Sequence, residues 1–255
     1  MTDNTEFYDL LNSLAQQQSF DITLSDGSPA KFKQLKTAQL KELIKTIVDS
    51  PLTQAVFSST INKILVANLL SKTKPELNTV DRLLFILGAR IDTLSSKLVL
   101  EKEKESVAVD LSSVVSKLNQ ELKLNKELLE NKTSTEGDVE ITYGVPTLET
   151  ENKLVDEIYS KLKVNVEDAD ELRKALGEAF INEIAKTVKT IKIQDKTLDF
   201  STITFRSRIK TIESLPANLI NNVIQYIEKY KSLLDKCLTV DNVVIPIDGS
   251  LFSSR

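Results

Sequence analysis

Hydrophobic positions in this chain follow two periods, and the shorter of them predicts β-hairpins. Between residues 20 and 24 hydrophobic and polar side chains alternate, a turn-forming stretch follows at 25–29, and 30–32 returns as a second strand. The same alternation predicts further strands at 97–101, 106–111, 138–143 and 243–247, and a second hairpin at 190–200.

The longer period predicts amphipathic helices. From Thr37 onward, hydrophobic residues recur at Leu40, Leu43, Ile44 and three to four positions beyond, so one stripe faces a core. Thr37 and Thr79 stand where a helix cap is expected. Other helices are predicted at 6–18, 61–69, 79–87, 114–129, 147–161, 166–186, 201–213 and 216–236. In the helix at 166–186, the expected buried stripe is Leu172, Leu176, Phe180, Ile184 and Val188.

Short hairpins placed among many helices indicate a helix-rich α+β fold. The polar stretch 131–137 interrupts the pattern and is the best linker candidate in the chain. We therefore expect three regions: 1–95 with a hairpin and helices, 96–137 with mixed strand and helix plus the linker, and a C-terminal α+β region at 138–255.

The composition argues against most enzyme classes. The chain has no histidine, which removes the usual general base, the commonest metal ligand and every nucleophile–histidine pair. Its six glycines are too far apart to form a phosphate-binding loop, and its one cysteine, Cys237, is expected to be a buried apolar residue. The sequence therefore predicts no enzyme, no cofactor and no metal site.

Two charged clusters have structural interpretations. Asp168, Asp170 and Glu171 stand at the start of a predicted helix, where acidic side chains favour the helix dipole. Arg206 and Arg208 resemble a phosphate-binding pair, but we expect them on an exposed helix face.

The charge balance favours a protein partner. The 33 basic and 37 acidic residues give a net charge of -4 and are mixed along the chain, unlike the basic surface of a nucleic-acid-binding protein. Residues 1–7 are polar and acidic, so we expect no signal peptide. No apolar run approaches the roughly 20 residues that cross a bilayer, so no membrane span is expected.

Four segments carry motifs that point to one family, and the first is the longest. Residues 20–41 combine a strand, a turn, a strand that ends in an aromatic-x-x-Leu motif, and a helix. Phe32, Leu35, Gln39 and Lys41 stand at the matching positions.

The other three segments follow in order over most of the chain. They are an apolar helix that ends in arginine (81–90), a strand followed by Pro-Thr-Leu (139–148), and the segment 198–216 together with Phe252. Together the four segments resemble the T4-like bacteriophage baseplate hub subunit family.

The resemblance implies a structural component of a contractile-tail baseplate hub that acts by protein–protein docking during tail assembly. Other tail and hub proteins, and the tape-measure protein, are the implied partners, with several copies around the tail axis. The implied location is the virion, after assembly in the host cytoplasm. Some members of the family carry paired cysteines that suggest a metal site; Cys237 is alone, so metal binding is not implied.

Candidate interface residues come from the resembling segments and from the predicted last strand, whose Pro246 suggests a sheet edge. They are Phe32, Leu35, Lys41, Arg90, Pro146, Val243, Ile245 and Phe252.

Three other functions remain open. An assembly chaperone would bind tape-measure or hub proteins transiently and be absent from the mature virion. A hydrolase of the cell wall would use a pair of carboxylates. A host-derived scaffold would have no relation to phage.

Overall fold

A computed structural model describes residues 18–46, 51–70, 76–102, 105–159 and 169–253. Within them it contains eight α-helices and four antiparallel sheets, which confirms the predicted helix-rich α+β class. The helix predicted at 6–18 lies almost entirely outside the described residues. None of the described helices is long and apolar enough to cross a membrane.

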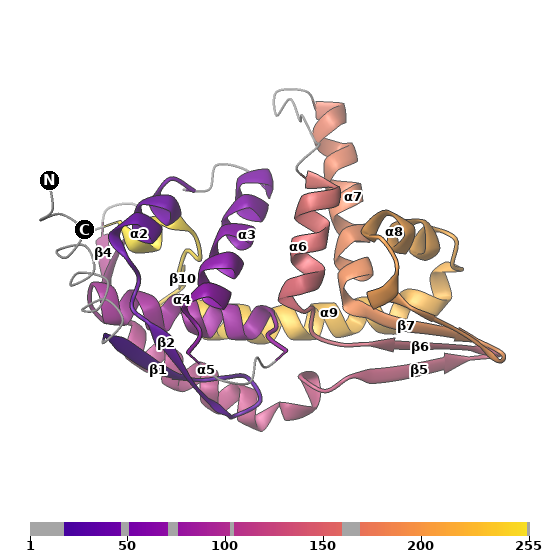
Figure 1. The fold of residues 1–255 in the computed structure, drawn as a ribbon, viewed down its shortest axis with the longest axis horizontal. Helices are drawn as coiled ribbons and strands as arrows, with labels where there is room; N and C mark the ends of the chain where they lie inside the picture. The colour runs from indigo at the N-terminus through magenta and orange to yellow at the C-terminus, as the bar shows by residue number, and fades with distance from the viewer. Residues whose placement is uncertain (1–17, 47–50, 71–75, 103–104, 160–168, 254–255) are drawn as a thin grey trace, which may run out of the picture. The chain divides into compact units, whose positions relative to one another are not determined.

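The chain forms two compact units (Figure 1). Unit 1 comprises Met1–Lys123 and Cys237–Arg255, and unit 2 comprises Leu124–Lys236, so unit 2 is inserted into the chain of unit 1. These units are groupings in space; the division of the sequence into 1–95, 96–137 and 138–255 stays a prediction.

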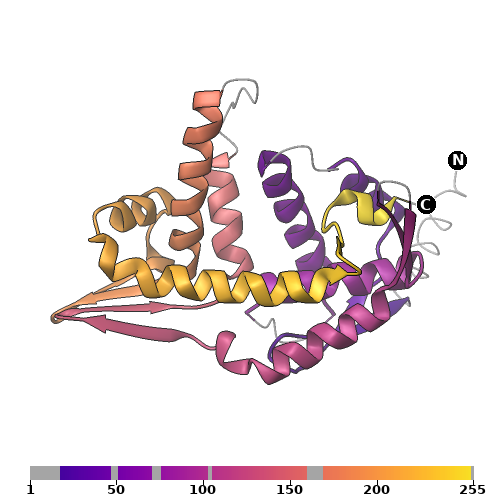
Figure 2. The ribbon, with the colours of Figure 1, turned by 180° about the vertical axis from the view of Figure 1, so that it is seen from behind.

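Unit 1 contains the hairpin predicted at 20–32, the strands predicted at 97–101 and 106–111, and most of the predicted helices of the N-terminal region. Its elements are β1 (Ser19–Thr23), β2 (Pro29–Lys33), α2 (Thr37–Ile44), α3 (Pro51–Asn68), α4 (Thr79–Thr93), β3 (Lys97–Lys102), β4 (Glu105–Asp110), α5 (Leu111–Leu124), β9 (Thr239–Val240), β10 (Val243–Val244) and the 3₁₀-helix η4 (Gly249–Phe252). The chain therefore returns to unit 1 after unit 2 is complete, and in Figure 2 the yellow η4 lies beside α2.

The core of unit 1 forms where the hairpin β1–β2 packs on α4. Phe20 and Phe32 face each other across the hairpin with ring centroids 5.9 Å apart, and Phe85 of α4 lies 5.8 and 5.0 Å from them. All three rings are buried. Aromatic pairs at these distances add to the stabilisation from burial, so this triad fixes the hairpin on the helix.

Gly88 lets β1 approach α4 closely. A Cβ atom at this position would lie 2.8 Å from Cγ2 of Ile22 and 3.3 Å from Cε2 of Phe20, which is too close for ordinary packing. The absence of a side chain at Gly88 is therefore what allows the two elements to touch.

The N-terminus of α4 corrects the predicted caps. Asn78, not Thr79, is the cap, since its side chain accepts hydrogen bonds from backbone N–H groups of the first turn. Asp81 accepts from the backbone N–H of Asn78 (3.0 Å) and from that of Ser25 (2.8 Å), which joins the hairpin turn to the helix. Thr37 is likewise the first residue of α2 rather than its cap.

Unit 2 is built on a four-stranded antiparallel sheet of order β5-β6-β7-β8. Its elements are the 3₁₀-helix η1 (Lys126–Leu128), β5 (Lys132–Glu136), β6 (Val139–Tyr143), α6 (Leu148–Glu157), α7 (Ala169–Thr187), β7 (Val188–Ile193), β8 (Lys196–Asp199), the 3₁₀-helix η3 (Phe200–Thr202), α8 (Phe205–Glu213) and α9 (Ala217–Leu238). The helices α6, α7 and α8 rise from the same side of the strands (Figures 1 and 2). The core includes Ile141, Tyr143, Ile184, Ile191, Phe200, Phe205, Ile212 and Val223.

The linker predicted at 131–137 is instead a strand with a turn. Residues 132–136 form β5, which pairs with β6 in register, and Gly137 begins the two-residue turn with a φ of 58°. Because β5 is polar throughout, it has no hydrophobic alternation to signal it, and backbone pairing alone reveals it.

The stripe predicted on α7 is partly wrong. Ile184 and Val188 are buried, although Val188 already belongs to β7, whereas Phe180 is 50% exposed. The side chains of Leu172 and Leu176 lie outside the described residues.

Substitution of Gly88 by alanine tests the close packing of β1 on α4. Alanine is favoured over glycine in a helix, but here its methyl group would displace Ile22 and Phe20, so we expect G88A to be destabilised by about 1–3 kcal/mol. Urea unfolding, monitored by far-UV circular dichroism, measures this change in the free energy of unfolding. G177A in α7 is the matched control: no atom lies within 4 Å of its Cβ, so it should be up to about 1 kcal/mol more stable. Equal effects of both substitutions would contradict the packing argument.

Candidate interface

Most of the predicted interface residues lie inside the fold. Five are buried: Phe32, Arg90, Pro146, Ile245 and Phe252. Leu35 and Val243 are half-buried, and Lys41 is exposed. Contact between any of the eight residues and another protein stays a prediction. Pro146 belongs to unit 2 and the other seven to unit 1.

Arg90 connects three parts of unit 1. It lies in the last turn of α4, and its Nε donates to the carbonyl of Leu251 at 2.7 Å. Nη1 donates to the carbonyl of Ser95 at 2.6 Å, and Nη2 to that of Lys97 at 3.4 Å. Burial lowers the pKa of the Arg90 guanidinium from its ordinary value. The planar guanidinium has several N–H donors and can therefore bind three carbonyls at once. These hydrogen bonds hold η4 and the start of β3 against the end of α4.

The C-terminal segment that Arg90 holds also packs on α2, the helix that carries Lys41. The structure thus brings together two of the resembling segments with the region of Phe252. Leu35 precedes α2, and the backbone of Phe32 forms an isolated bridge with Leu69 at the end of α3.

The strand predicted at 243–247 is shorter than expected. Only Val243 and Val244 pair, with β9, through a tight turn in which Asp241 and Asn242 have φ values of 49° and 61°. The N–H of Ile245 still donates to the carbonyl of Leu238 at 2.9 Å, but Leu238 is the last residue of α9, so the pairing goes no further. Val244 is 62% exposed at this short hairpin.

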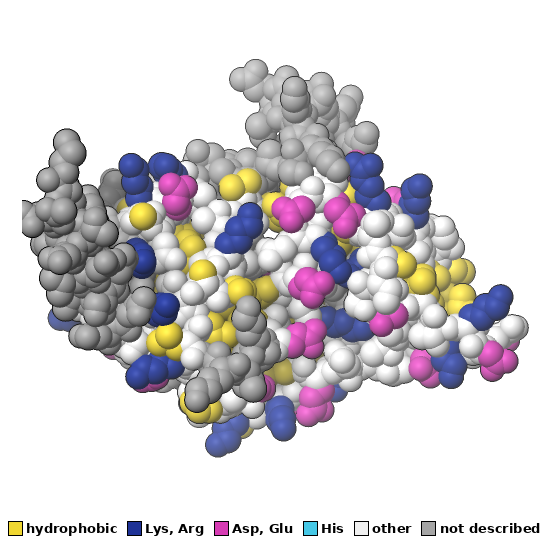
Figure 3. Space-filling model, in the orientation of Figure 1, with side chains coloured by type: hydrophobic (Ala, Val, Ile, Leu, Met, Phe, Trp, Pro, Cys, Tyr) yellow, Lys and Arg dark blue, Asp and Glu magenta, His cyan; other side chains and the backbone are white. Residues whose placement is uncertain are grey.

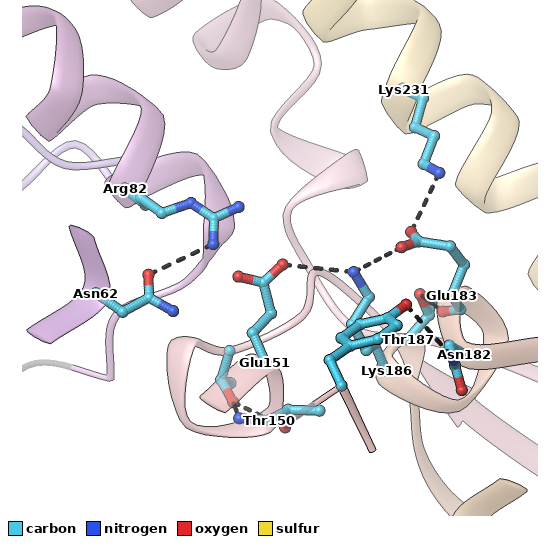
Figure 4. Close-up of polar contacts among 11 residues, drawn as sticks. Asn62, Arg82, Thr150, Glu151, Asn182, Glu183, Lys186, Thr187 and Lys231 are labelled. Carbon is cyan, nitrogen blue, oxygen red and sulfur yellow. Dashed lines mark hydrogen bonds and ion pairs between the residues drawn. The ribbon is translucent and has the colours of Figure 1, made fainter. Parts of the chain in front are cut away.

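Unit 2 contains an ion-pair network that the sequence reading missed (Figure 4). The ammonium group of Lys186 lies 2.6 Å from Glu183 Oε1 and 3.4 Å from Glu151 Oε1, and Lys231 Nζ lies 3.1 Å from Glu183 Oε2. The side chains of Lys186 and Glu151 are only 10% and 9% exposed. Lys186, between two carboxylates, therefore connects α6 with α7, and Lys231 connects α9 to the same network.

The charges around Glu183 set its protonation. Burial raises the pKa of its carboxyl group, but the ammonium groups of Lys186 and Lys231 outweigh this effect, so the pKa lies below its ordinary 4.5. Glu183 is therefore ionised at neutral pH. Its spacing from Lys186, three residues along α7, is a signal that the sequence contains.

Arg208 is not on an exposed face as expected; it is 2% exposed. Its guanidinium carbon lies 5.9 Å from the ring centre of Phe200 and 5.7 Å from that of Phe205, and Nη1 donates to Thr150 Oγ1 at 3.4 Å. Burial lowers its pKa despite nearby carboxylates. Aromatic faces attract a cation, which explains how this charge is accommodated in the core. Arg206, two residues before it, is exposed as expected.

Two other predicted features concern chemistry. Cys237 is buried, as predicted. Of the acidic cluster, Asp168 and the side chains of Asp170 and Glu171 lie outside the described residues. Elsewhere in the described part of the chain, no group of three or more Cys, Asp or Glu side chains is placed to hold a metal ion.

Comparison with known proteins finds no matching family model, no matching curated protein and no matching solved structure. The relationship to baseplate hub subunits therefore stays a hypothesis based on the four resembling segments.

Replacement of Arg90 tests its role in closing unit 1. R90M keeps an unbranched side chain but removes every donor to the carbonyls of Leu251, Ser95 and Lys97. We expect a loss of about 3 kcal/mol or more in the free energy of unfolding, with faster hydrogen exchange in η4. The exposed Arg206 provides the control, since R206M should change stability by less than about 0.5 kcal/mol. If both variants behave alike, the guanidinium does not hold η4.

Removal of the ammonium group of Lys186 tests the ion-pair network. K186M should destabilise unit 2 by about 3 kcal/mol at pH 7, because Glu151 and Glu183 lose the cation between them. K231M, at a lysine that is 51% exposed, should cost less than about 1 kcal/mol.

The effect of K186M should depend on pH. The pKa of Glu183 is lowered in the folded protein, so its contribution is fully present above pH 4.5 and is lost as the pH falls through the folded value. The difference between wild type and K186M should therefore shrink in acid. Urea unfolding between about pH 3 and 8, a range that begins below the ordinary pKa values of carboxyl groups and ends well above them, measures this. A difference independent of pH would contradict the prediction.

Proposed function

We propose that this chain is a structural component of a contractile-tail phage baseplate hub and acts by docking to other tail proteins during assembly. The observation that carries the proposal is spatial: the segments that resemble the family are far apart in the sequence but meet in common cores. A resemblance that arose by chance from short motifs would not require such convergence.

In unit 1 two resembling segments meet the region of Phe252, which is the last part of the fourth segment. Residues 20–41 supply Phe20 and Phe32, and residues 81–90 supply Phe85, which contacts both. Arg90, the arginine that ends the apolar helix, holds the carbonyl of the residue before Phe252. Two segments that resemble the family and the region of Phe252 therefore contribute residues to one core, which supports a shared fold as the cause of the resemblance.

In unit 2 the third segment meets residues 198–216 of the fourth. Residues 139–148 contribute Ile141 and Tyr143 to the core, and residues 198–216 contribute Phe200 and Ile212 to the same cluster. The two segments thus form one sheet-and-helix core, which again supports a fold-level origin of the motifs.

The surface suits docking to proteins. Charged side chains of both signs are interspersed with hydrophobic ones on the face shown in Figure 3. Exposed hydrophobic side chains of unit 1 include Val56, Val66, Leu94 and Val99. Apolar groups of this kind supply buried area in a protein interface, while charged groups around them set its orientation. The proposed partners are other hub proteins and the tape-measure protein.

Protein composition of purified tails tests the proposal. Quantitative mass spectrometry of mature particles should find this chain in fixed stoichiometry with the known baseplate proteins. Its presence in tail-assembly intermediates but absence from mature particles would instead support a transient assembly chaperone. Its absence from both would overturn the proposal.

A docking variant gives the assay a matched control. In K41E the charge of an exposed side chain in a resembling segment is reversed without loss of any buried contact, and we expect fewer copies per particle. In K229E the charge of an exposed lysine outside the resembling segments is reversed, and this variant should incorporate normally.

A further inference from the structure

The polar strand β5 forms one edge of the sheet of unit 2. In the part of the chain that the structure describes, β5 has a strand neighbour on one side only, β6. Glu136 and Val139 are the pair that closes its two-residue turn, so Glu136, Ser134 and Lys132 direct their backbone groups toward β6. The N–H and C=O groups of Thr133 and Thr135 therefore point away from the sheet.

The sequence of β5, Lys-Thr-Ser-Thr-Glu, is complementary to itself when one copy is reversed. In an antiparallel pair centred on Ser134, Thr133 of each copy lies opposite Thr135 of the other. Both residues present free backbone groups, so each such pair exchanges two hydrogen bonds. Lys132 then lies opposite Glu136 of the second copy, on the same face of the sheet.

We propose that β5 pairs antiparallel with β5 of a second copy of this chain, in the register centred on Ser134. The two four-stranded sheets then form one continuous sheet across a two-fold axis. This register satisfies the outward backbone groups and places an ion pair at each end of the contact. In the single chain the carboxylate of Glu136 accepts a hydrogen bond from Asn218, which holds the charge near the edge.

Other registers of β5 are disfavoured by charge. A shift of two residues in one direction places Glu136 opposite Glu130 of the second copy, which is repulsive. The same shift in the other direction moves Lys132 opposite Asp138, which lies in the turn beyond the end of the strand. The charges at the two ends of β5 therefore select one alignment.

The other edges do not offer this complementarity. In β8 the charged residues Lys196 and Asp199 are three positions apart. When the same edge strand of two copies pairs antiparallel, two residues an odd number of positions apart cannot lie opposite each other, because the hydrogen-bonding positions alternate. In β3 the edge is already occupied at Lys97, whose N–H donates to Ser95 Oγ and whose carbonyl accepts from Arg90.

The contact is small, so the association is expected to be weak. Five residues on each side bury much less than the roughly 1,200 Å² of a standard interface, which suggests a dissociation constant on the order of 100 µM. Such a contact forms where local concentration is high. The inference does not rest on the proposed function, and its failure would leave that proposal unchanged.

Charge reversal and charge exchange test the register. Sedimentation of the full chain from about 10 to about 500 µM, a range that spans this dissociation constant, should show the average mass rising from 28.5 kDa toward twice that value. K132E and E136K each place like charges opposite one another and should weaken association at least about tenfold. The double variant K132E/E136K restores opposite charges and should recover it. A constant mass, or association that both single variants leave intact, would overturn the proposal.

Disulfide trapping tests the same register without relying on charge. Ser134 lies opposite its own copy at a distance that a disulfide spans, so S134C should form a covalent dimer under mild oxidation. T133C is the control, since Thr133 faces Thr135 of the second copy and its own counterpart is too far away. The native Cys237 is buried and should not interfere. Equal dimer formation by both variants, or none by S134C while circular dichroism shows it folded, would rule out this pairing.

Discussion

Unit 1 depends on one buried cation whose hydrogen-bond partners are carbonyl oxygens. The three carbonyls that Arg90 holds belong to η4 and to the segment that leads into β3. The end of α4 therefore positions both the β3–β4 hairpin and the C-terminal segment. The aromatic triad fixes the other side of α4 to β1–β2. The helix α4 thus contacts both the hairpin that precedes it in the chain and the C-terminal segment that follows it, and it links these parts of unit 1.

Local periodicity made much of the fold predictable. The hairpins at β1–β2, β3–β4 and β7–β8 and the main helices carry their own patterns, because each buries one face. The strand β5 carries no such pattern, since its partners are backbone groups of β6 and its side chains stay polar. The pattern predicts the cap of α4 at Thr79, one residue after Asn78, because both residues are good caps.

The candidate site was harder to predict than the fold. Aromatic residues and arginine serve equally well as core residues and as interface anchors, and only tertiary contacts separate the two uses. Phe32, Arg90 and Phe252 turn out to be core residues of the chain itself. Similarly, the spacing of Glu183 and Lys186 is visible in α7, but nothing local connects them to Glu151. Arg208 can be buried because its guanidinium lies over the ring of Phe200 and donates a hydrogen bond to Thr150, and both residues come from other elements.

The insertion of unit 2 has a consequence for the order in which the chain can fold. Residues 124–236 form unit 2 from one continuous stretch, whereas unit 1 needs residues on both sides of it. On the ribosome, the whole of unit 2 is synthesised before Leu251, so one of the three carbonyls that Arg90 holds becomes available only after unit 2 has been made. Unit 2 can therefore fold from its own stretch of chain, whereas Arg90 gains its last carbonyl partner only after residues 124–236 have been made.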